Sequence, residues 1–221
     1  MRFFKLLLAL GAVFYLSGCA SSYPGIQPEN LSYNSKNIAE DGITMGYRYD
    51  LLPKKYAKKE KKEDIRLVAV KLKNNTNKEL VFGQDYKLVF EGGNNVTVLS
   101  KDKVFSELKQ KGAFHLLYLL LTPVTLNKTT NDGNGSVTTE SIFPIGLIIG
   151  PGIAALNLIK ASSSNKRFEK ELYKYNLNNE SLKPGEEKFG IIGIRSDSYD
   201  ALNINFIGNI DVEEDNDTSV E

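Results

Sequence analysis

The chain contains one cysteine, Cys19, among its 221 residues. A single thiol cannot form a disulfide within the chain, so buried apolar side chains must hold the fold together. About 200 residues follow Cys19, which is enough for one domain with an elaboration or for two small domains. The pattern of apolar residues after Cys19 therefore decides the fold.

The residues before Cys19 have the pattern of a bacterial export signal. Arg2 and Lys5 give a positive start, residues 6–16 are apolar, and a Leu-Ser-Gly-Cys sequence follows at once. This sequence resembles the lipobox of bacterial lipoproteins, in which the cysteine thiol receives a diacylglycerol. The resemblance implies a signal peptide over 1–18 and lipidation at Cys19. An ordinary secretory signal that happens to precede a cysteine is the alternative.

The charge of the mature chain bears on its partners. Removing residues 1–18 leaves 26 basic and 27 acidic side chains, a net charge of −1. Nucleic acid would require a clustered excess of Lys and Arg, so we expect no nucleic-acid partner. Acylated Cys19 implies membrane lipid as a partner. Because Ala20 is not the aspartate that retains some lipoproteins at the inner membrane, we expect the outer membrane, facing the periplasm.

Alternating apolar residues predict several short strands. Residues 43–51 show this alternation, and residues 65–73 (IRLVAVKLK) show it most strongly. Val68, Val70 and Leu72 share one face of the second strand, which predicts that all three face the core. Further strands are predicted at 80–82, 86–90, 96–99, 189–195 and 202–206. Short strands separated by turn signals favour an antiparallel sandwich.

Two turn motifs accompany these strands. An Asn-Asn-Thr sequence at 74–76 ends one strand, and a Leu-Lys-Pro-Gly-Glu sequence at 182–186 precedes another. The two motifs resemble those in the Ig-like domains of bacterial lipoproteins of uncharacterised function. The resemblance implies a mainly β fold, an Ig-like antiparallel β-sandwich over 42–208 with an apolar helical insertion, and a place in the cell envelope. It brings no catalytic residues.

Three polar stretches lie outside this pattern. Residues 19–41 hold two prolines and few apolar side chains, which predicts a lipidated tether. The tail 209–221 has six acids and no base, which predicts disorder. Residues 53–64 hold six lysines and three acids. We interpret them as a solvated loop between strands, and a patch for anionic lipid is the alternative.

The insertion, residues 102–177, begins and ends with helical patterns. Residues 102–109 read as a short helix that Asp102 could cap. Residues 165–177 place Phe168, Leu172 and Tyr175 on one helical face, and the serines at 162–164 could cap its start.

Two apolar segments, 113–124 and 142–160, lie between these helices. The first would reach only about 18 Å as a helix against a hydrocarbon thickness near 30 Å, and Pro and Gly interrupt the second. We therefore expect no single spanning helix. Gly146 and Gly150 would allow two helices to approach closely.

Two interpretations of the apolar segments remain. In the interpretation that we prefer, the segments fold against an open face of the sandwich and complete its core. Alternatively, they form a hairpin whose apolar face meets the membrane or a partner. The predicted contact residues of that hairpin are Leu116, Leu119, Leu120, Ile145, Ile148 and Ile149.

No pattern in the chain predicts a catalytic or cofactor site. Residues 150–155 match the G-x-G-x-x-A fingerprint, but no βαβ pattern surrounds them. Three Ser-x-x-Lys matches lack the companion motifs of penicillin-binding proteins. His115 is the one histidine and lies in an apolar run, which favours a structural role. We expect no enzyme, no cofactor and no metal site.

The sequence thus predicts a non-enzymatic, lipid-anchored cell-envelope protein that acts as a protein-binding or structural module, with another envelope protein as partner. A lipid- or membrane-binding module that uses the apolar insertion is the first alternative. An envelope hydrolase with a site built from scattered residues is the second.

Overall fold

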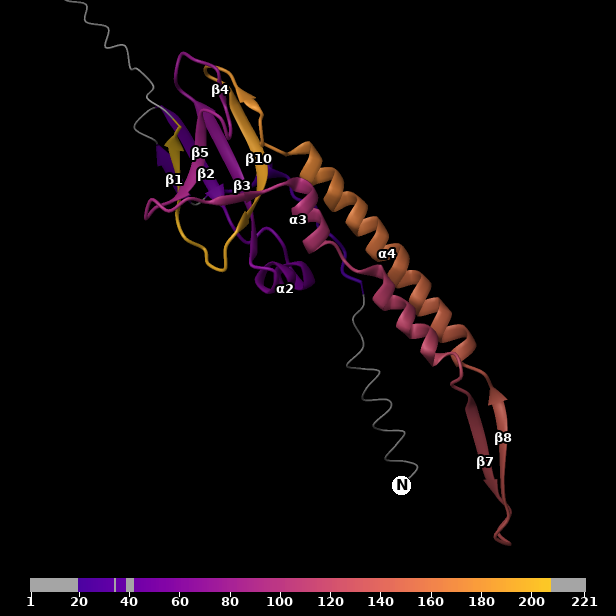
Figure 1. The fold of residues 1–221 in the computed structure, drawn as a ribbon. Helices are drawn as coiled ribbons and strands as arrows, with labels where there is room; N and C mark the ends of the chain where they lie inside the picture. The colour runs from indigo at the N-terminus through magenta and orange to yellow at the C-terminus, as the bar shows by residue number, and fades with distance from the viewer. Residues whose placement is uncertain (1–19, 34, 39–41, 208–221) are drawn as a thin grey trace, which may run out of the picture. The chain divides into compact units, whose positions relative to one another are not determined.

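The computed structural model describes residues 20–33, 35–38 and 42–207 (Figure 1). Cys19 with its lipobox and the acidic tail lie outside the described residues. The chain divides into two compact units. One, called here the hairpin unit, contains residues 20–24 and Lys109–Phe168; the other, the sheet unit, contains Gly25–Leu108 and residues 169–207.

A five-stranded antiparallel sheet forms the centre of the sheet unit. Its strand order is β1-β2-β3-β10-β6, and β3 pairs with β10 along its length, with Val70 opposite Gly190. Figure 1 shows these two long strands side by side. The strands are β1 (Ser35–Ile38), β2 (Ile43–Arg48), β3 (Ile65–Asn74), β6 (Thr97–Leu99) and β10 (Glu187–Arg195).

Two smaller sheets share a core with the large sheet. They pair β5 (Tyr86–Phe90) with β11 (Leu202–Phe206) and β4 (Leu80–Val81) with β9 (Ser181–Leu182). The core cluster joins residues from all three sheets. Val68, Val70 and Leu72 belong to it and are buried, which confirms the predicted orientation of the strand.

Helices cover the opposite face of the large sheet. Helix α2 (Lys54–Lys62) packs on β3, and helix α3 (Lys101–Leu108) packs on β10. Leu67 and Ala69, which face away from the sheet-to-sheet core, are therefore fully buried as well. The expectation of antiparallel sheets is confirmed, but the chain is not mainly β. Helices make up 33% and strands 31% of it, which makes the fold a mixed one.

Several local predictions need correction in the sheet unit. Residues 53–64 form helix α2 instead of a loop, because Tyr56 and Glu60, four positions apart, turn the same buried face toward the sheet. Helix α3 exists as predicted, but Ser100 caps it: its Oγ accepts a hydrogen bond from the Lys103 N–H. A short 3-10 helix, η1 (Pro28–Asn30), lies within the segment interpreted as a tether.

The hairpin unit is built from two helical limbs and a β-hairpin. The 3-10 helix η2 (Gly112–Leu121) is followed by β7 (Leu126–Asn131) and β8 (Val137–Phe143), and α4 (Gly146–Lys174) returns. Strands β7 and β8 pair antiparallel between the two apolar segments, where no strand was predicted from the sequence. Helix α4 begins at Gly146 and continues through Pro151, so the expected interruption of this segment by Pro and Gly is wrong. Its C-terminal end belongs to the sheet unit. The predicted cap at 162–164 is therefore wrong, because those serines lie inside a continuous helix.

Candidate functional site

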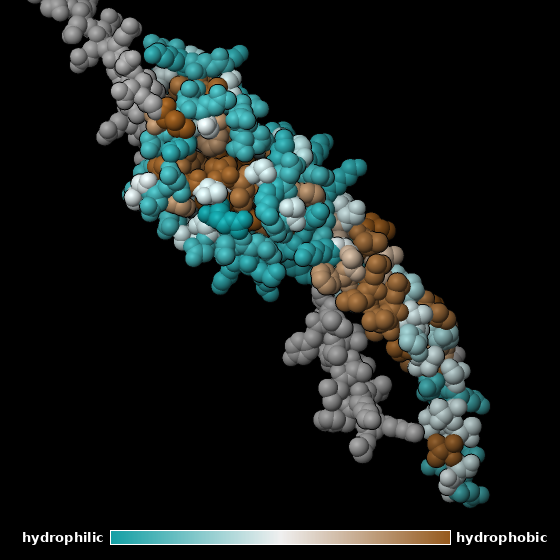
Figure 2. Space-filling view, viewed as in Figure 1, coloured by the Kyte–Doolittle hydropathy of each residue, from teal (hydrophilic) through white to brown (hydrophobic). Residues whose placement is uncertain are grey.

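The hairpin unit exposes most of its large apolar side chains. Fifteen of them, between Phe114 and Ile159, are more than 40% accessible. In the described part of the sheet unit only three large apolar side chains are comparably exposed, namely Tyr173, Tyr199 and Ile207. Figure 2 shows the apolar surface in brown over η2 and the first half of α4. Soluble proteins rarely leave so much contiguous apolar surface open, so this unit is the candidate site.

The predicted contact residues lie on this surface with one exception. Leu116, Leu119, Leu120, Ile148 and Ile149 are exposed, whereas Ile145 is half-buried at the start of α4. No described residue of 113–124 or 142–160 belongs to the core cluster of the sheet unit. The core of the sheet unit is therefore formed without these segments, and the preferred interpretation, in which they complete that core, gains no support from it.

A row of small residues on α4 faces the other limb. Gly146, Gly150 and Ala154 are buried one helical turn apart. A Cβ at Gly150 would lie 2.8 Å from the Tyr118 carbonyl oxygen, and one at Gly146 would overlap the Leu121 carbonyl oxygen. The backbones of η2 and α4 therefore approach too closely for any side chain, as the spacing of the two glycines predicted.

The interior between the limbs contains two aromatic rings from η2. His115 and Tyr118 are both buried, and their rings are parallel within 3° at a centroid distance of 6.5 Å. His115 is therefore part of the packing between the limbs, which agrees with the structural role predicted for it.

The outward apolar residues of α4 surround more than half of the helix. Leu147, Ile148, Ile149, Leu156 and Ile159 are among them. With 3.6 residues per turn, the exposed apolar residues from Leu147 to Ile159 spread over an arc of about 200°. Because η2 covers the remaining arc and exposes leucines of its own, the two limbs present apolar side chains to their surroundings on every outer face.

The segment directly after Cys19 is fixed to α4. The Ala20 N–H donates to Asn157 Oδ1 at 2.7 Å, and the Tyr23 N–H donates to Ser164 Oγ at 3.2 Å. Tyr23 is buried, and its ring packs on Phe168 at a centroid distance of 5.1 Å. Residues 20–24 are thus bound to α4, whereas the sequence predicted that they form the start of a tether.

Gln110 joins the same segment to both limbs. Its side chain accepts from the Ser21 N–H at 2.9 Å and donates to the Ser21 carbonyl oxygen at 2.6 Å. Its backbone makes two hydrogen bonds, each 2.8 Å long, with the Asn165 side chain. This network was not predicted from the sequence. The one sign of it there is a set of amide and hydroxyl side chains on α4 that lie seven or eight residues apart.

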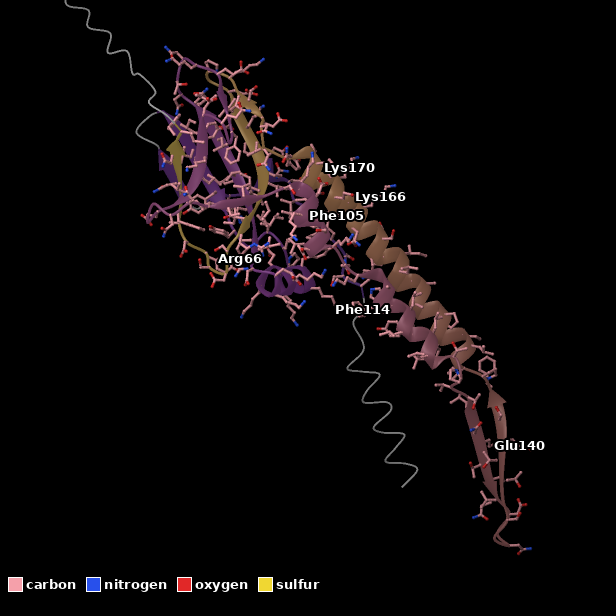
Figure 3. All side chains as sticks on the ribbon, viewed as in Figure 1. Arg66, Phe105, Phe114, Glu140, Lys166 and Lys170 are labelled. Carbon is pink, nitrogen blue, oxygen red and sulfur yellow. The ribbon has the colours of Figure 1, made fainter. Side chains whose placement is uncertain are left out.

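Charged residues bound the apolar limbs at one end. None occurs from 112 to 127 or from 144 to 159. Lys109 and Lys111 precede η2, and Lys160 follows the last apolar turn of α4; all three are exposed. Figure 3 shows Lys166 extending from α4 and Glu140 on β8, within the polar strands at the opposite end of this unit.

A second polar cluster lies inside the sheet unit. Glu60 is 6% exposed, and its Oε1 accepts a hydrogen bond from the Leu67 N–H at 2.8 Å. Burial raises the pKa of Glu60 to about 7, although this hydrogen bond and the nearby charge of Arg66 both oppose the rise. Arg66 is itself buried, with its guanidinium 4.8 Å from the centre of the Tyr199 ring.

This cluster holds elements of the sheet unit together. The guanidinium donates to the carbonyl oxygens of Ile65 and Asp197, and Glu60 ties α2 to β3. The Nε of Arg66 has no hydrogen-bond partner among the described residues. Within the same described ranges, no group of three or more His, Cys, Asp or Glu side chains is placed to hold a metal ion.

Comparison with protein-family models, curated proteins and solved structures finds no similar protein. Among the described residues, Gly146–Lys174 is the one helix long and apolar enough to cross a membrane by length and composition. Only 28% of its most apolar window is buried. The exposed surface of the hairpin unit therefore carries the functional argument.

Proposed function

We propose that the protein is a lipid-anchored cell-envelope protein without enzymatic activity, and that its hairpin unit is a membrane-binding module. The observation that carries this proposal is the set of fifteen exposed apolar side chains on that unit. Lipidation at Cys19, inferred from the lipobox, supports an envelope location and supplies a first attachment to the bilayer.

Lipid fits this surface better than a protein groove does. A helix that docks in a groove uses one apolar stripe, and a helix that lies flat on a membrane keeps one strongly polar face. The limbs of the hairpin unit have no polar outer face, and no charge interrupts them. A helix that is apolar all round belongs in a core or in a bilayer.

The β7–β8 hairpin limits where the bilayer can lie. Its outer backbone edges need water, and it carries Lys128, Asp132 and Glu140, so it belongs outside the hydrocarbon region. The apolar band between the paired residues Leu126 and Phe143 and the first charge of α4 is about 25–30 Å long. That length is close to the hydrocarbon thickness of a bilayer, so the proposed hairpin crosses it.

The sheet unit is proposed to be the protein-binding part. Its large sheet and its two small sheets enclose one core, which supports an Ig-like sandwich arrangement with two helices added on the outer face. The partner expected from the sequence is another envelope protein.

The proposal is tested with the mature chain, residues 19–221, carrying Cys19→Ser and therefore no acyl chains. We expect it to bind phosphatidylcholine vesicles in a flotation assay, and Leu119→Lys with Ile148→Lys to abolish this binding. Both side chains are exposed, so the substitutions should leave the melting temperature of the sheet unit unchanged. Asn77→Lys with Asn94→Lys adds the same charge to exposed positions of the sheet unit and should bind like the parent. Unchanged flotation of the Leu119/Ile148 variant would contradict the proposal.

A further inference from the structure

Five cations gather where the apolar limbs of the hairpin unit end. We infer that they form a collar that binds the anionic headgroups of the leaflet holding the acyl chains of Cys19. The collar residues are Lys109, Lys111, Lys160, Lys166 and Arg167, and all five are exposed. This inference rests on the proposed membrane insertion of the hairpin unit, and it adds the depth of insertion and the class of lipid.

The change from apolar to cationic is abrupt on both limbs. On α4, Ile159 is the last large apolar residue of the exposed surface and Lys160 the first charge. The hydrogen bonds between Gln110 and Asn165 hold Lys109 and Lys111 level with this part of α4. No acid occurs from 109 to 127 or from 144 to 168, and acids resume at Glu169. These two stretches of the chain therefore carry positive charges only.

Four of these side chains are available to an external anion. Among the described residues, the ion pairs do not include Lys111, Lys160, Lys166 or Arg167. Figure 3 shows Lys166 directed away from the helix. Lysine and arginine at such a boundary keep their stems along apolar surface and place their charges among headgroups.

The segment that follows the proposed lipid attachment point lies at this boundary. Ala20 is hydrogen-bonded to Asn157, one turn before Lys160. We infer that acyl chains on the preceding residue, Cys19, enter the leaflet whose headgroups the collar binds.

The affinity expected from the collar is large enough to measure. A Lys or Arg near an anionic surface strengthens binding by about fivefold, so four of them supply a few hundredfold at low salt. The effect should shrink as salt screens the surface, because the Debye length falls to about 8 Å at physiological ionic strength.

The test compares two kinds of vesicle with the unacylated mature chain carrying Cys19→Ser. One contains phosphatidylcholine alone, and the other replaces one part in four with phosphatidylglycerol. We expect at least a hundredfold preference for the anionic vesicle. The collar variant, with Lys111, Lys160, Lys166 and Arg167 all changed to Gln, should lose that preference but keep the affinity of the parent for the neutral vesicle.

A control variant removes four exposed lysines from the sheet unit. Changing Lys58, Lys61, Lys73 and Lys78 to Gln alters the net charge equally and should preserve the preference for anionic vesicles. A collar variant that retains the preference, or a control that loses it, would overturn the inference. A parent chain that binds both vesicles equally would overturn it too but leave membrane insertion standing, whereas no binding to either vesicle would refute the proposed function itself.

Discussion

The two units differ in whether their large aliphatic side chains are buried or exposed. The sheet unit buries those of its large sheet on both faces, one against the small sheets and one under α2 and α3. On the helical limbs of the hairpin unit, small and polar residues such as Gly150, Ala154 and Asn157 are buried, and most leucines and isoleucines are exposed. Both units have an interior, but only that of the sheet unit contains most of its large aliphatic side chains.

The difference follows from what each backbone can hide. A strand places alternate residues on opposite faces, so a second layer can cover each face of β3. Two helices that touch cover only one side of each other, and the described part of the hairpin unit has no third layer. Exposure of the limbs is therefore built into the architecture, and three predictions test this contrast between the units.

The largest effect is expected at the centre of the sheet unit. Val70→Asp places a carboxylate in a fully buried position without a partner, which should cost several kcal/mol and unfold this unit. Lys73→Asp, three residues along the same strand but exposed, is the control and should fold. Thermal unfolding followed by circular dichroism measures both. Equal melting temperatures for the two variants would show that the register of β3 is wrong.

The next effect concerns pH and the sheet unit alone. Because burial raises the pKa of Glu60 to about 7, the folded state keeps a proton that the unfolded state releases near pH 4.5. The free energy of unfolding should therefore fall by up to about 3 kcal/mol as pH rises from about 4.5 to about 7. Glu60→Gln keeps the acceptor for the Leu67 N–H and should remove this part of the pH dependence. Denaturant titrations of both proteins at pH 5 and pH 8 measure the free energy of unfolding. If it changed equally with pH in the two proteins, the pH dependence could not come from Glu60.

The smallest effect separates two neighbouring glycines of α4. Gly150→Ala would press a methyl group against the Tyr118 carbonyl oxygen and should destabilise the contact between the limbs by about 1–3 kcal/mol. Gly152→Ala meets open space and should stabilise the helix by up to about 1 kcal/mol. Amide hydrogen exchange in α4 reports both changes. If Gly150→Ala slowed exchange as much as Gly152→Ala does, the limbs could not be in the close contact described.

The sequence predicted those elements whose signal is local. Strands β3, β5 and β10 were recognisable because their alternation is regular, and the last turns of α4 because Phe168 and Leu172 keep a helical spacing. Helix α2 was not predicted because Glu60, one of the two side chains of α2 that the structure describes as buried, is a carboxylate, which a hydropathy pattern counts as solvated.

Part of the candidate site was equally readable. The apolar composition of both limbs pointed to Leu116, Leu119, Leu120, Ile148 and Ile149, all of which are exposed. The bound segment after Cys19 was not readable, because its backbone groups bond to side chains far along the chain, such as Asn157 and Ser164. The position of Lys109 and Lys111 beside α4 in the cationic collar likewise depends on long-range contacts, which join Gln110 to Asn165.

It follows from the amino-acid sequence alone that the limbs carry no charge, that Gly146 and Gly150 are four residues apart, and that the chain has one cysteine. Which apolar residues remain exposed depends on the fold. The physical reason is that burial depends on what lies opposite each residue: the glycines bring η2 against one side of α4 and leave the larger side chains of its other side uncovered.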